Sequence, residues 1–259
     1  NNKILNSTID INSSSLAGNV NAIYLNNTTP QLLNNSIDML TSNSTVNNGI
    51  YMTDCIGSTS SIKDKLYIEN LNLSNNYFTS NTGSTSTGID INNSSFILKN
   101  SEIEVSNNLD NTNNYGIKIS SAGNIAPYLS KTTTNVISFV NTTTGVNAGL
   151  NTIESSDISG FNFITENYDR GHYISVSGST DNDGIYKISN TITSNVITLE
   201  TGFNLVNESA SAGNNITLKA LYDINIYNTT IKASSNTIKN ADTNSNYNVN
   251  LYNVINEGS

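Results

Sequence analysis

The sequence predicts an all-β chain made of many short strands joined by sharp corners. Asparagine fills about fifty of its 259 positions, whereas glutamine occurs once, at Gln31. Asparagine tolerates the left-handed backbone of tight corners and forms amide ladders when identical positions stack. The chain is also rich in Ile, Val and Thr, which argues against disorder. No window has the apolar spacing of an amphipathic helix, so strands joined by turns remain.

Two strand types alternate along the first 120 residues, each recurring at an interval near thirty. The first follows an Asn-Ser-like corner and alternates apolar with polar residues, at Ser7–Ile11, Asn35–Met39, Glu69–Leu73 and Ser101–Val105. The second begins with a small residue, at Ala22–Leu25, Gly49–Met52, Gly88–Ile91 and Gly116–Ile119. Alternation with period two is typical of strands with one buried face.

Short strands at a fixed long interval, without helices, predict a solenoid in which each repeat stacks on the previous one. The parallel β-helix meets these conditions, with repeats about 4.8 Å apart and inward Ile, Leu, Val and Met in columns. We expect β-helix repeats over 1–147 and a return to such strands over 221–259. Between them, over 148–220, we expect an inserted or appended small antiparallel β module.

The repeat resembles that of right-handed parallel β-helix proteins of the pectin-lyase-like type, found in viral tail spikes and fibres. The resemblance rests on a Gly-Ile-x-apolar strand, an Asn corner and a second x-Ile-x-apolar strand. It covers roughly residues 1–125, and the strand-then-corner pattern returns at Asp223–Ile231 and Asn248–Ile255. It implies an architecture and says little about function.

The segment 148–220 has a different composition, with the only Arg and the only His of the chain. Two alternating strands over Gly171–Ile188 flank Asp181–Gly184, which predicts a hairpin. Further strands are predicted at Asn195–Glu200 and Asn215–Lys219, which makes a meander of four or five strands.

This segment is similar to a small β module of bacteriophage and other virion structural proteins. The matching residues are Gly171–Ser179, Asn182–Gly184, Tyr186–Ile188, Thr198–Glu200, Glu208–Gly213 and Ile216–Leu218. One departure is His172, where the pattern usually has Asp after Gly. The resemblance implies a virus particle.

Composition excludes several functions. The net charge is −9 and no basic run occurs, so nucleic acid is not expected as a partner. No apolar stretch is long enough for a membrane span. The single cysteine, Cys55, is expected to be a small buried side chain. No phosphate loop and no spacing of metal ligands is present, so no cofactor or metal is expected.

Four outward positions of the first strand type predict a polar file on one face: Asp10, Asp38, Asn72 and Glu104. Paired carboxylates on a β-helix face serve as acid and base, or hold Ca²⁺, in enzymes that cleave polysaccharides. The other interpretation is that they are ordinary solvent positions of half-buried strands. We name Asp10, Asp38 and Glu104 as glycan-binding candidates and no residue as catalytic.

Tyr24 and Tyr51 occupy equivalent outward positions of the second strand type. Their flat faces could stack on sugar rings, or pack on each other to stabilise the sheet. Asp181–Gly184 superficially resembles the start of a calcium loop, but an EF-hand needs flanking helices, so we interpret it as a turn. His172 and Asp169 lack the Gly-x-Ser-x-Gly elbow that a serine nucleophile would need.

These patterns lead to one reading of function and two alternatives. We expect a structural and adhesive part of a virion appendage or surface, which contacts host glycans or other virion proteins and forms a homotrimer. A polysaccharide lyase or glycosidase on the same β-helix, or a cellular adhesin or surface-layer protein, are the alternatives. The host, the glycan, the handedness of the coil, any catalytic role and the completeness of the chain stay open.

Overall fold

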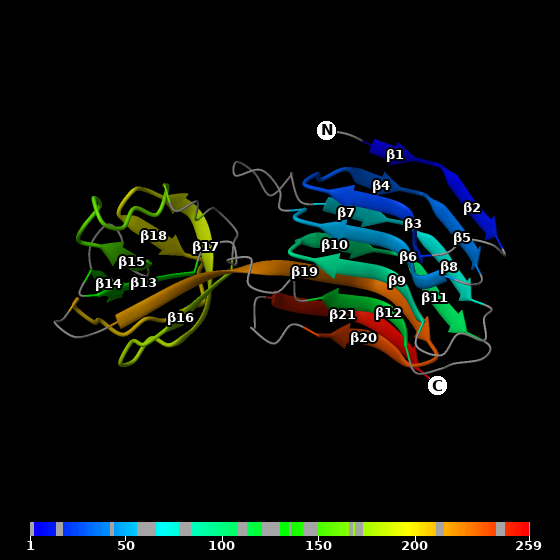
Figure 1. Cartoon of the computed structure of the whole chain (residues 1–259). Coiled ribbons are helices and arrows are strands. Elements are labelled where there is room, and N and C mark those ends of the chain that lie inside the picture. The colour runs from blue at the N-terminus through cyan, green and yellow to red at the C-terminus, as the bar shows by residue number, and fades with distance from the viewer. Residues whose placement is uncertain are drawn as a thin grey trace. The chain divides into compact units, whose positions relative to one another are not determined.

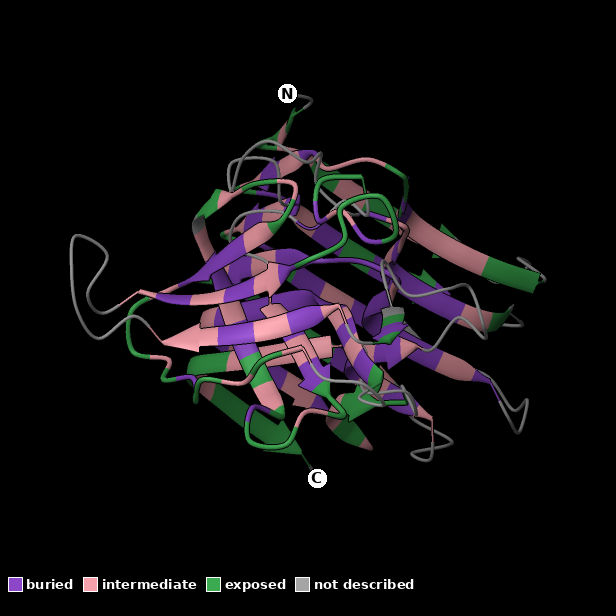
Figure 2. Cartoon of the chain, turned by 90° about the vertical axis from the view of Figure 1, so that its left-hand side faces the viewer, coloured by how far each residue is buried: buried purple, intermediate pink, exposed green. Residues whose placement is uncertain are grey.

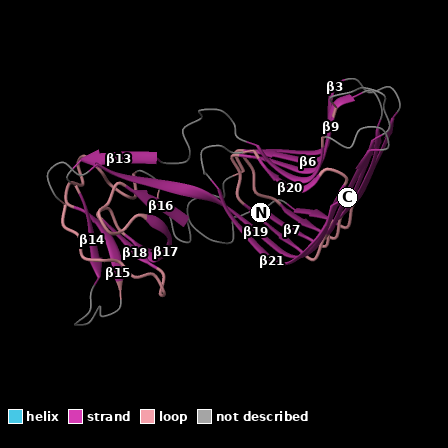
Figure 3. Cartoon of the chain, turned by 90° about the horizontal axis from the view of Figure 1, so that it is seen from below, coloured by secondary structure: helices cyan, strands magenta, loops and turns pink. Residues whose placement is uncertain are grey.

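The computed structural model of the chain is all-β, as the sequence predicts, and its described residues contain no helix (Figures 1 and 3). The structure describes residues 3–13, 18–41, 44–55, 66–77, 84–107, 113–120, 130–134, 136–141, 150–165, 168, 173–210, 215–241 and 247–258. Contacts divide the chain into two units. Unit 1 comprises 1–57, 64–123 and 223–259, and unit 2 comprises 58–63 and 124–222.

Unit 1 consists of three files of parallel strands, and the chain visits each file once per repeat, here called a rung (Figure 1). File 1 contains β1 (Lys3–Leu5), β4 (Gln31–Leu33), β7 (Leu66–Glu69), β10 (Phe96–Lys99) and part of β19 (Asn215–Ala233). File 2 contains β2 (Thr8–Ser13), β5 (Ser36–Thr41), β8 (Asn72–Tyr77), β11 (Glu102–Asn107) and the end of β19. File 3 contains β3 (Gly18–Asn26), β6 (Ser44–Thr53), β9 (Thr85–Asn92), β12 (Asn114–Ser120) and β20 (Asn236–Asn240). β21 (Tyr247–Gly258) pairs with β19.

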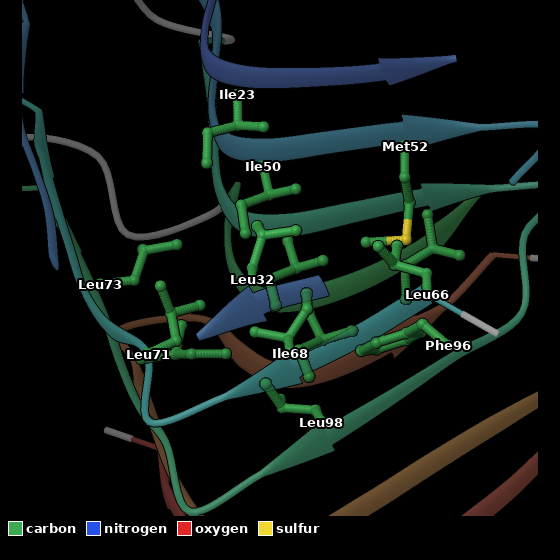
Figure 4. Packing of buried hydrophobic residues seen from close by; sticks show 14 of the residues in the cluster. Ile23, Leu32, Ile50, Met52, Leu66, Ile68, Leu71, Leu73, Phe96 and Leu98 are labelled. Carbon is green, nitrogen blue, oxygen red and sulfur yellow. The ribbon is translucent and has the colours of Figure 1, made fainter. Parts of the chain in front are cut away.

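The core of unit 1 forms columns, because equivalent residues of successive rungs pair in register. File 1 stacks Ile4, Leu32, Ile68, Leu98 and Ile226. File 2 stacks Ile9, Ile37, Leu73, Ile103 and Ile231, and file 3 stacks Ile23, Ile50, Ile89, Ile117 and Ile238. Most of these side chains are fully buried, and Figure 4 shows several of them pointing into a common interior. Burying each contributes about 1.5–3 kcal/mol. The arrangement is compatible with a β-helix-like fold.

The corner between files 1 and 2 is always asparagine in the left-handed conformation, and we call these residues the asparagine corner. Its members are Asn6, Asn34, Asn70, Asn100, Asn228 and Asn253, with φ between 46° and 56°. A left-handed residue turns the chain sharply, and asparagine adopts this conformation at little cost. The corners that the composition predicts are therefore present.

Glycine precedes the isoleucine of file 3 on the three central rungs, at Gly49, Gly88 and Gly116, for a packing reason. Ala22 and Thr237 hold this position on the two outer rungs. A Cβ at Gly88 would overlap Cγ2 of Ile103 and lie 2.5 Å from the carbonyl oxygen of Gly116. Only glycine lets the strand of file 3 approach file 2 this closely.

Unit 2 is an antiparallel sheet, with neighbours in the order β13, β19, β16, β17, β18, β15 and β14. Only β16, β17 and β18 follow one another as a meander, because β19 pairs with β16 instead of β18, so the predicted meander of four or five strands was wrong. Its strands are β13 (Ser130–Thr134), β14 (Ile137–Asn141), β15 (Asn151–Ser155), β16 (Tyr173–Ser177), β17 (Gly184–Ile192), β18 (Val196–Leu199) and the start of β19. β16 pairs with β17, so the predicted hairpin is confirmed. β13 and β14 fall in unit 2, although 1–147 was expected to hold β-helix repeats.

Buried and exposed residues alternate along many strands (Figure 2), but the two interiors differ in composition. The core of unit 1 is aliphatic apart from Phe96 and Cys55. The core of unit 2 contains Phe139, Phe161, Phe163, Tyr168 and Tyr186. The described residues include no helix long and apolar enough for a membrane crossing.

Candidate functional site

The predicted polar file lies on the outer face of file 2, with one difference in register. Asp10 pairs with Asp38, and Asp38 pairs with Ser74 instead of Asn72. Glu104 then pairs with Ser74 on one side and with Lys232 on the other. The assignment of Asn72 to this file was therefore wrong. A slip of two residues keeps the same face outward, so alternation alone did not reveal it.

In the observed register, one rung lies between Asp38 and Glu104, and Ser74 occupies the equivalent position on it. Two rung spacings of about 4.8 Å place their backbones about 10 Å apart. Asp10, Asp38 and Glu104 are all exposed. The structure thus brings together Asp10 and Asp38 as neighbours, but it does not bring Glu104 next to either of them.

A lysine offsets the negative charge at the far end of this face. Nζ of Lys232 lies 2.9 Å from Oε1 of Glu102 and 4.0 Å from Oε2 of Glu257. The hydrogen bond that Lys232 donates to Glu102 raises the pKa of the lysine, and the charges of Glu257 and Glu104 add to this effect. The lysine therefore stays protonated and offsets part of the negative charge of Glu102 and its neighbours.

The two tyrosine candidates stack on each other on file 3. The ring centroids of Tyr24 and Tyr51 are 5.5 Å apart and their planes differ by 9°. Tyr24 is 55% exposed, so one ring face is open to solvent. The pair stabilises the sheet across two rungs, and its open face is available to a flat ligand.

The same file continues with a charged pair that the sequence analysis missed. Asp90 pairs with Tyr51 and Lys118 in register. Its Oδ2 lies 3.3 Å from Nζ of Lys118, and its Oδ1 accepts a hydrogen bond of 2.7 Å from Oγ of Ser120. The sequence did contain a signal for this pair, because Asp90 directly follows Gly88-Ile89 and Lys118 directly follows Gly116-Ile117. Both carboxylate oxygens are occupied, so the pair acts as a link between rungs.

A second aromatic group lies on the outer face of file 1, directly before the asparagine corner. Tyr227 and Tyr252 stack with centroids 4.6 Å apart and planes within 6°. Nζ of Lys99 lies 5.2 Å from the ring centroid of Tyr227 and 5.6 Å from that of Tyr67. Tyr67 donates a hydrogen bond of 2.9 Å to Oε2 of Glu69. Burial and this carboxylate raise the pKa of Tyr67, so its hydroxyl remains protonated.

An open groove of about 480 Å³ lies over the asparagine corner. Its residues Asn100 and Asn228 directly follow Lys99 and Tyr227 in the chain. Its lining is mainly polar and includes Asn70, Asn72, Asn100, Glu102, Asn228 and Thr230. The sequence analysis singled out Asn72 among them, as a member of the polar file, but it named none of them as a glycan-binding candidate. The six corner asparagines were the available signal, because their spacing locates the corner on every rung.

The turn in unit 2 is structural, as its sequence predicts. Asp183 accepts hydrogen bonds of 2.8 Å from both the backbone N–H and the hydroxyl of Ser179, which lower its pKa. Glu208 accepts hydrogen bonds from Thr180, Asp181 and Asn182. Burial opposes ionisation of Glu208, but these hydrogen bonds outweigh it and lower the pKa. The carboxylates therefore close this turn.

The remaining reactive residues give no site. Cys55 is buried, which raises the pKa of its thiol. His172 and Asp169 lie outside the described residues. Within the described part of the chain, no three His, Cys, Asp or Glu side chains are grouped as metal ligands would be. Comparison of the sequence with family models and with curated proteins gives no match.

Proposed function

We propose that unit 1 is a parallel β-helix and that the protein is a structural and adhesive part of a virion appendage or surface. In-register parallel pairing of all three files supports the β-helix. The resemblance of the repeat to tail-spike proteins, and of 148–220 to a phage structural module, favours a virion. A stack of hydrogen-bonded rungs makes a stiff scaffold whose outward side chains vary without disturbing the core.

The single observation that carries the adhesive role is the display of stacked tyrosines on the outer faces of files 1 and 3. Tyr252 is 48% exposed and Tyr24 is 55% exposed, although each is stacked on a neighbouring ring. Tyrosine presents an apolar face and a polar edge, which suits contact with glycans or with neighbouring subunits. The proposed partners are host glycans, other virion proteins and two further copies of the chain.

Two measurements test this proposal. Immunogold labelling of purified particles with an antibody to this chain should mark an appendage or the particle surface. Labelling of cell-surface filaments instead would favour the adhesin or surface-layer alternative. Analytical ultracentrifugation of the full-length protein should give a homotrimer, and a monomer at all concentrations would remove that part of the proposal.

Depolymerisation of host polysaccharides separates a binder from the enzyme alternative. We expect binding without cleavage, because Asp38 and Glu104 are exposed and separated by Ser74. If the wild type cleaves and Asp38→Ala with Glu104→Ala abolishes cleavage, the protein is an enzyme. Cleavage that survives both substitutions would place the catalytic residues elsewhere.

A further inference from the structure

The asparagine corner carries a ladder of side-chain amides that is interrupted at one place. Nδ2 of Asn34 donates to Oδ1 of Asn6 at 3.0 Å, and Asn70 donates to Asn34 at 2.8 Å. Beyond the interruption, Asn228 donates to Asn100 at 3.2 Å, and Asn253 donates to Asn228 at 3.0 Å. The step between Asn70 and Asn100 is the missing one.

The interruption has a local cause in Glu69. Nδ2 of Asn100 donates to Oε1 of Glu69 at 3.2 Å instead of to the amide of Asn70. A carboxylate is a stronger acceptor than an amide oxygen, so Glu69 takes the donor. Oδ1 of Asn70 is then left without a donor among the described residues, and it lines the groove.

The groove offers further unused hydrogen-bonding groups on adjacent rungs. Asn72, Glu102 and Thr230 pair in register, so they lie side by side across three rungs. In the described structure, the side chains of Asn72 and Thr230 make no hydrogen bond, and Glu102 uses only Oε1, which Lys232 holds. An amide, a carboxylate oxygen and a hydroxyl therefore recur at a spacing of about 4.8 Å.

An aromatic surface borders this polar row. Tyr227 directly precedes the groove residue Asn228 and stacks on Tyr252, which is 48% exposed. A sugar ring likewise combines an apolar surface with polar groups, because it has an apolar C–H face and hydroxyls around its edge. The rung spacing is also comparable to the length of one sugar residue in an extended chain. A flat apolar ligand would leave the polar row unpaired, which costs binding energy.

The charges in and around the groove favour a neutral ligand. Among the described residues around the groove, the carboxylates Glu69, Glu102, Glu104 and Glu257 outnumber the lysines Lys99 and Lys232. An anionic glycan would meet this excess of carboxylates on a chain with a net charge of −9. A neutral glycan can donate hydroxyls to Asn70 and Glu102 without such repulsion.

We propose that the groove at the interrupted asparagine ladder binds a neutral oligosaccharide, with hydroxyls on Asn70, Asn72, Glu102 and Thr230 and one ring against Tyr252. This inference rests on the proposed adhesive function and names the site for it. The glycan lies along the stack of rungs, so successive sugar residues meet successive rungs.

Isothermal titration calorimetry of the full chain with cellohexaose, maltohexaose and hexa-N-acetylchitohexaose tests the proposal, with polygalacturonate as the anionic comparison. We expect at least one neutral hexasaccharide to bind. Asn72→Ala and Tyr252→Ala should each weaken that binding about ten-fold, since each loses a direct contact. Asn72 is exposed and has no side-chain hydrogen bond among described residues, so its variant should fold.

Each variant has a matched control outside the groove. Ser36→Ala changes the same strand position one rung earlier. Ile158→Ala removes an apolar side chain of unit 2 that is 55% exposed. Asn34→Gly removes ladder hydrogen bonds outside the groove and serves as the control for Asn70→Gly. Asn70→Gly removes ladder hydrogen bonds and also a side chain that lines the groove. The controls should change the dissociation constant less than about two-fold.

The outcomes separate this inference from the proposed function. If a neutral glycan binds equally well to Asn72→Ala and Tyr252→Ala, the groove is not its site, although the adhesive role stands. Binding of polygalacturonate alone would overturn the choice of a neutral ligand. If the wild type binds none of the four, the groove proposal fails, and adhesion through glycans loses its support as well.

Discussion

Units 1 and 2 fill their interiors in two different ways. In unit 1 each inward side chain lies over an equivalent one, so a column accepts β-branched and aliphatic residues such as Ile37 and Ile103. In unit 2 the antiparallel strands enclose an irregular space, which aromatic side chains such as Phe161 and Phe163 fill. Stacking therefore selects repeated shapes, whereas the antiparallel sheet of unit 2 selects shapes that differ from strand to strand.

Their turns differ in the same way. Unit 1 turns at left-handed asparagines whose amides bond to the next rung. Unit 2 closes its turn with carboxylates such as Asp183 and Glu208, which bond within the turn or to a neighbouring loop. The stability of unit 1 should therefore depend mainly on residues that allow its backbone geometry. The stability of unit 2 should depend more on the ionisation of its turn carboxylates.

Gly88→Ala should have the largest effect and should destabilise unit 1 selectively. The added Cβ would overlap Ile103 and the backbone of Gly116, so we expect a loss of about 3 kcal/mol. Hydrogen exchange in increasing urea, followed on peptides of each unit, measures it. As a control, Gly258→Ala meets its nearest atom at 3.9 Å and should change stability by less than about 0.5 kcal/mol. Unchanged protection in unit 1 would contradict the packing argument.

Asn34→Ala should destabilise unit 1 by about 2 kcal/mol, through left-handed strain and the loss of ladder hydrogen bonds. Asn34→Gly relieves the strain and loses only the hydrogen bonds, so about 1 kcal/mol is expected. Chemical denaturation of both variants measures the difference. Equal stability of the two would show that the left-handed conformation is not what selects asparagine here.

Acidification should weaken unit 2 through Glu208. The pKa of this residue in the folded state lies below its ordinary value of 4.5, so the unfolded state binds more protons at mildly acidic pH. The resulting stability is present above pH 4.5 and is lost as the pH falls through the folded value. Glu208→Gln should lose it at pH 7 and flatten the dependence on pH. A variant as stable as the wild type at pH 7 would rule this contribution out.

Tyr24→Ala should have the smallest effect on stability, about 0.5 kcal/mol, because the stacked ring is half exposed. Thermal unfolding followed by circular dichroism checks it. A loss above about 2 kcal/mol would mean that the pair is part of the core instead of a surface for ligands.

Much of unit 1 follows from local patterns. The alternation at Ile37–Met39 predicts which side chains are buried, and the interval near thirty predicts stacking. The hairpin of unit 2 follows from Asp181–Gly184 in the same way. The register of β8 did not follow, because Leu73 could pair with Ile37 or with Met39 of β5 without changing faces. Aligning the corner residues Asn34 and Asn70 would have given the correct register, because Ser36 and Asn72 each lie two residues after their corner and pair with each other.

Local chemistry by itself determined that the chain is all-β, where it turns and which faces its strands bury, since period-two alternation and left-handed corners act within a few residues. The tertiary structure alone decided which outward side chains become neighbours, such as Asp90 with Lys118 and Asn72 with Glu102. It also decided that Asn100 turns to Glu69 and interrupts the ladder. These contacts join residues about thirty positions apart, and no local preference of the chain specifies them.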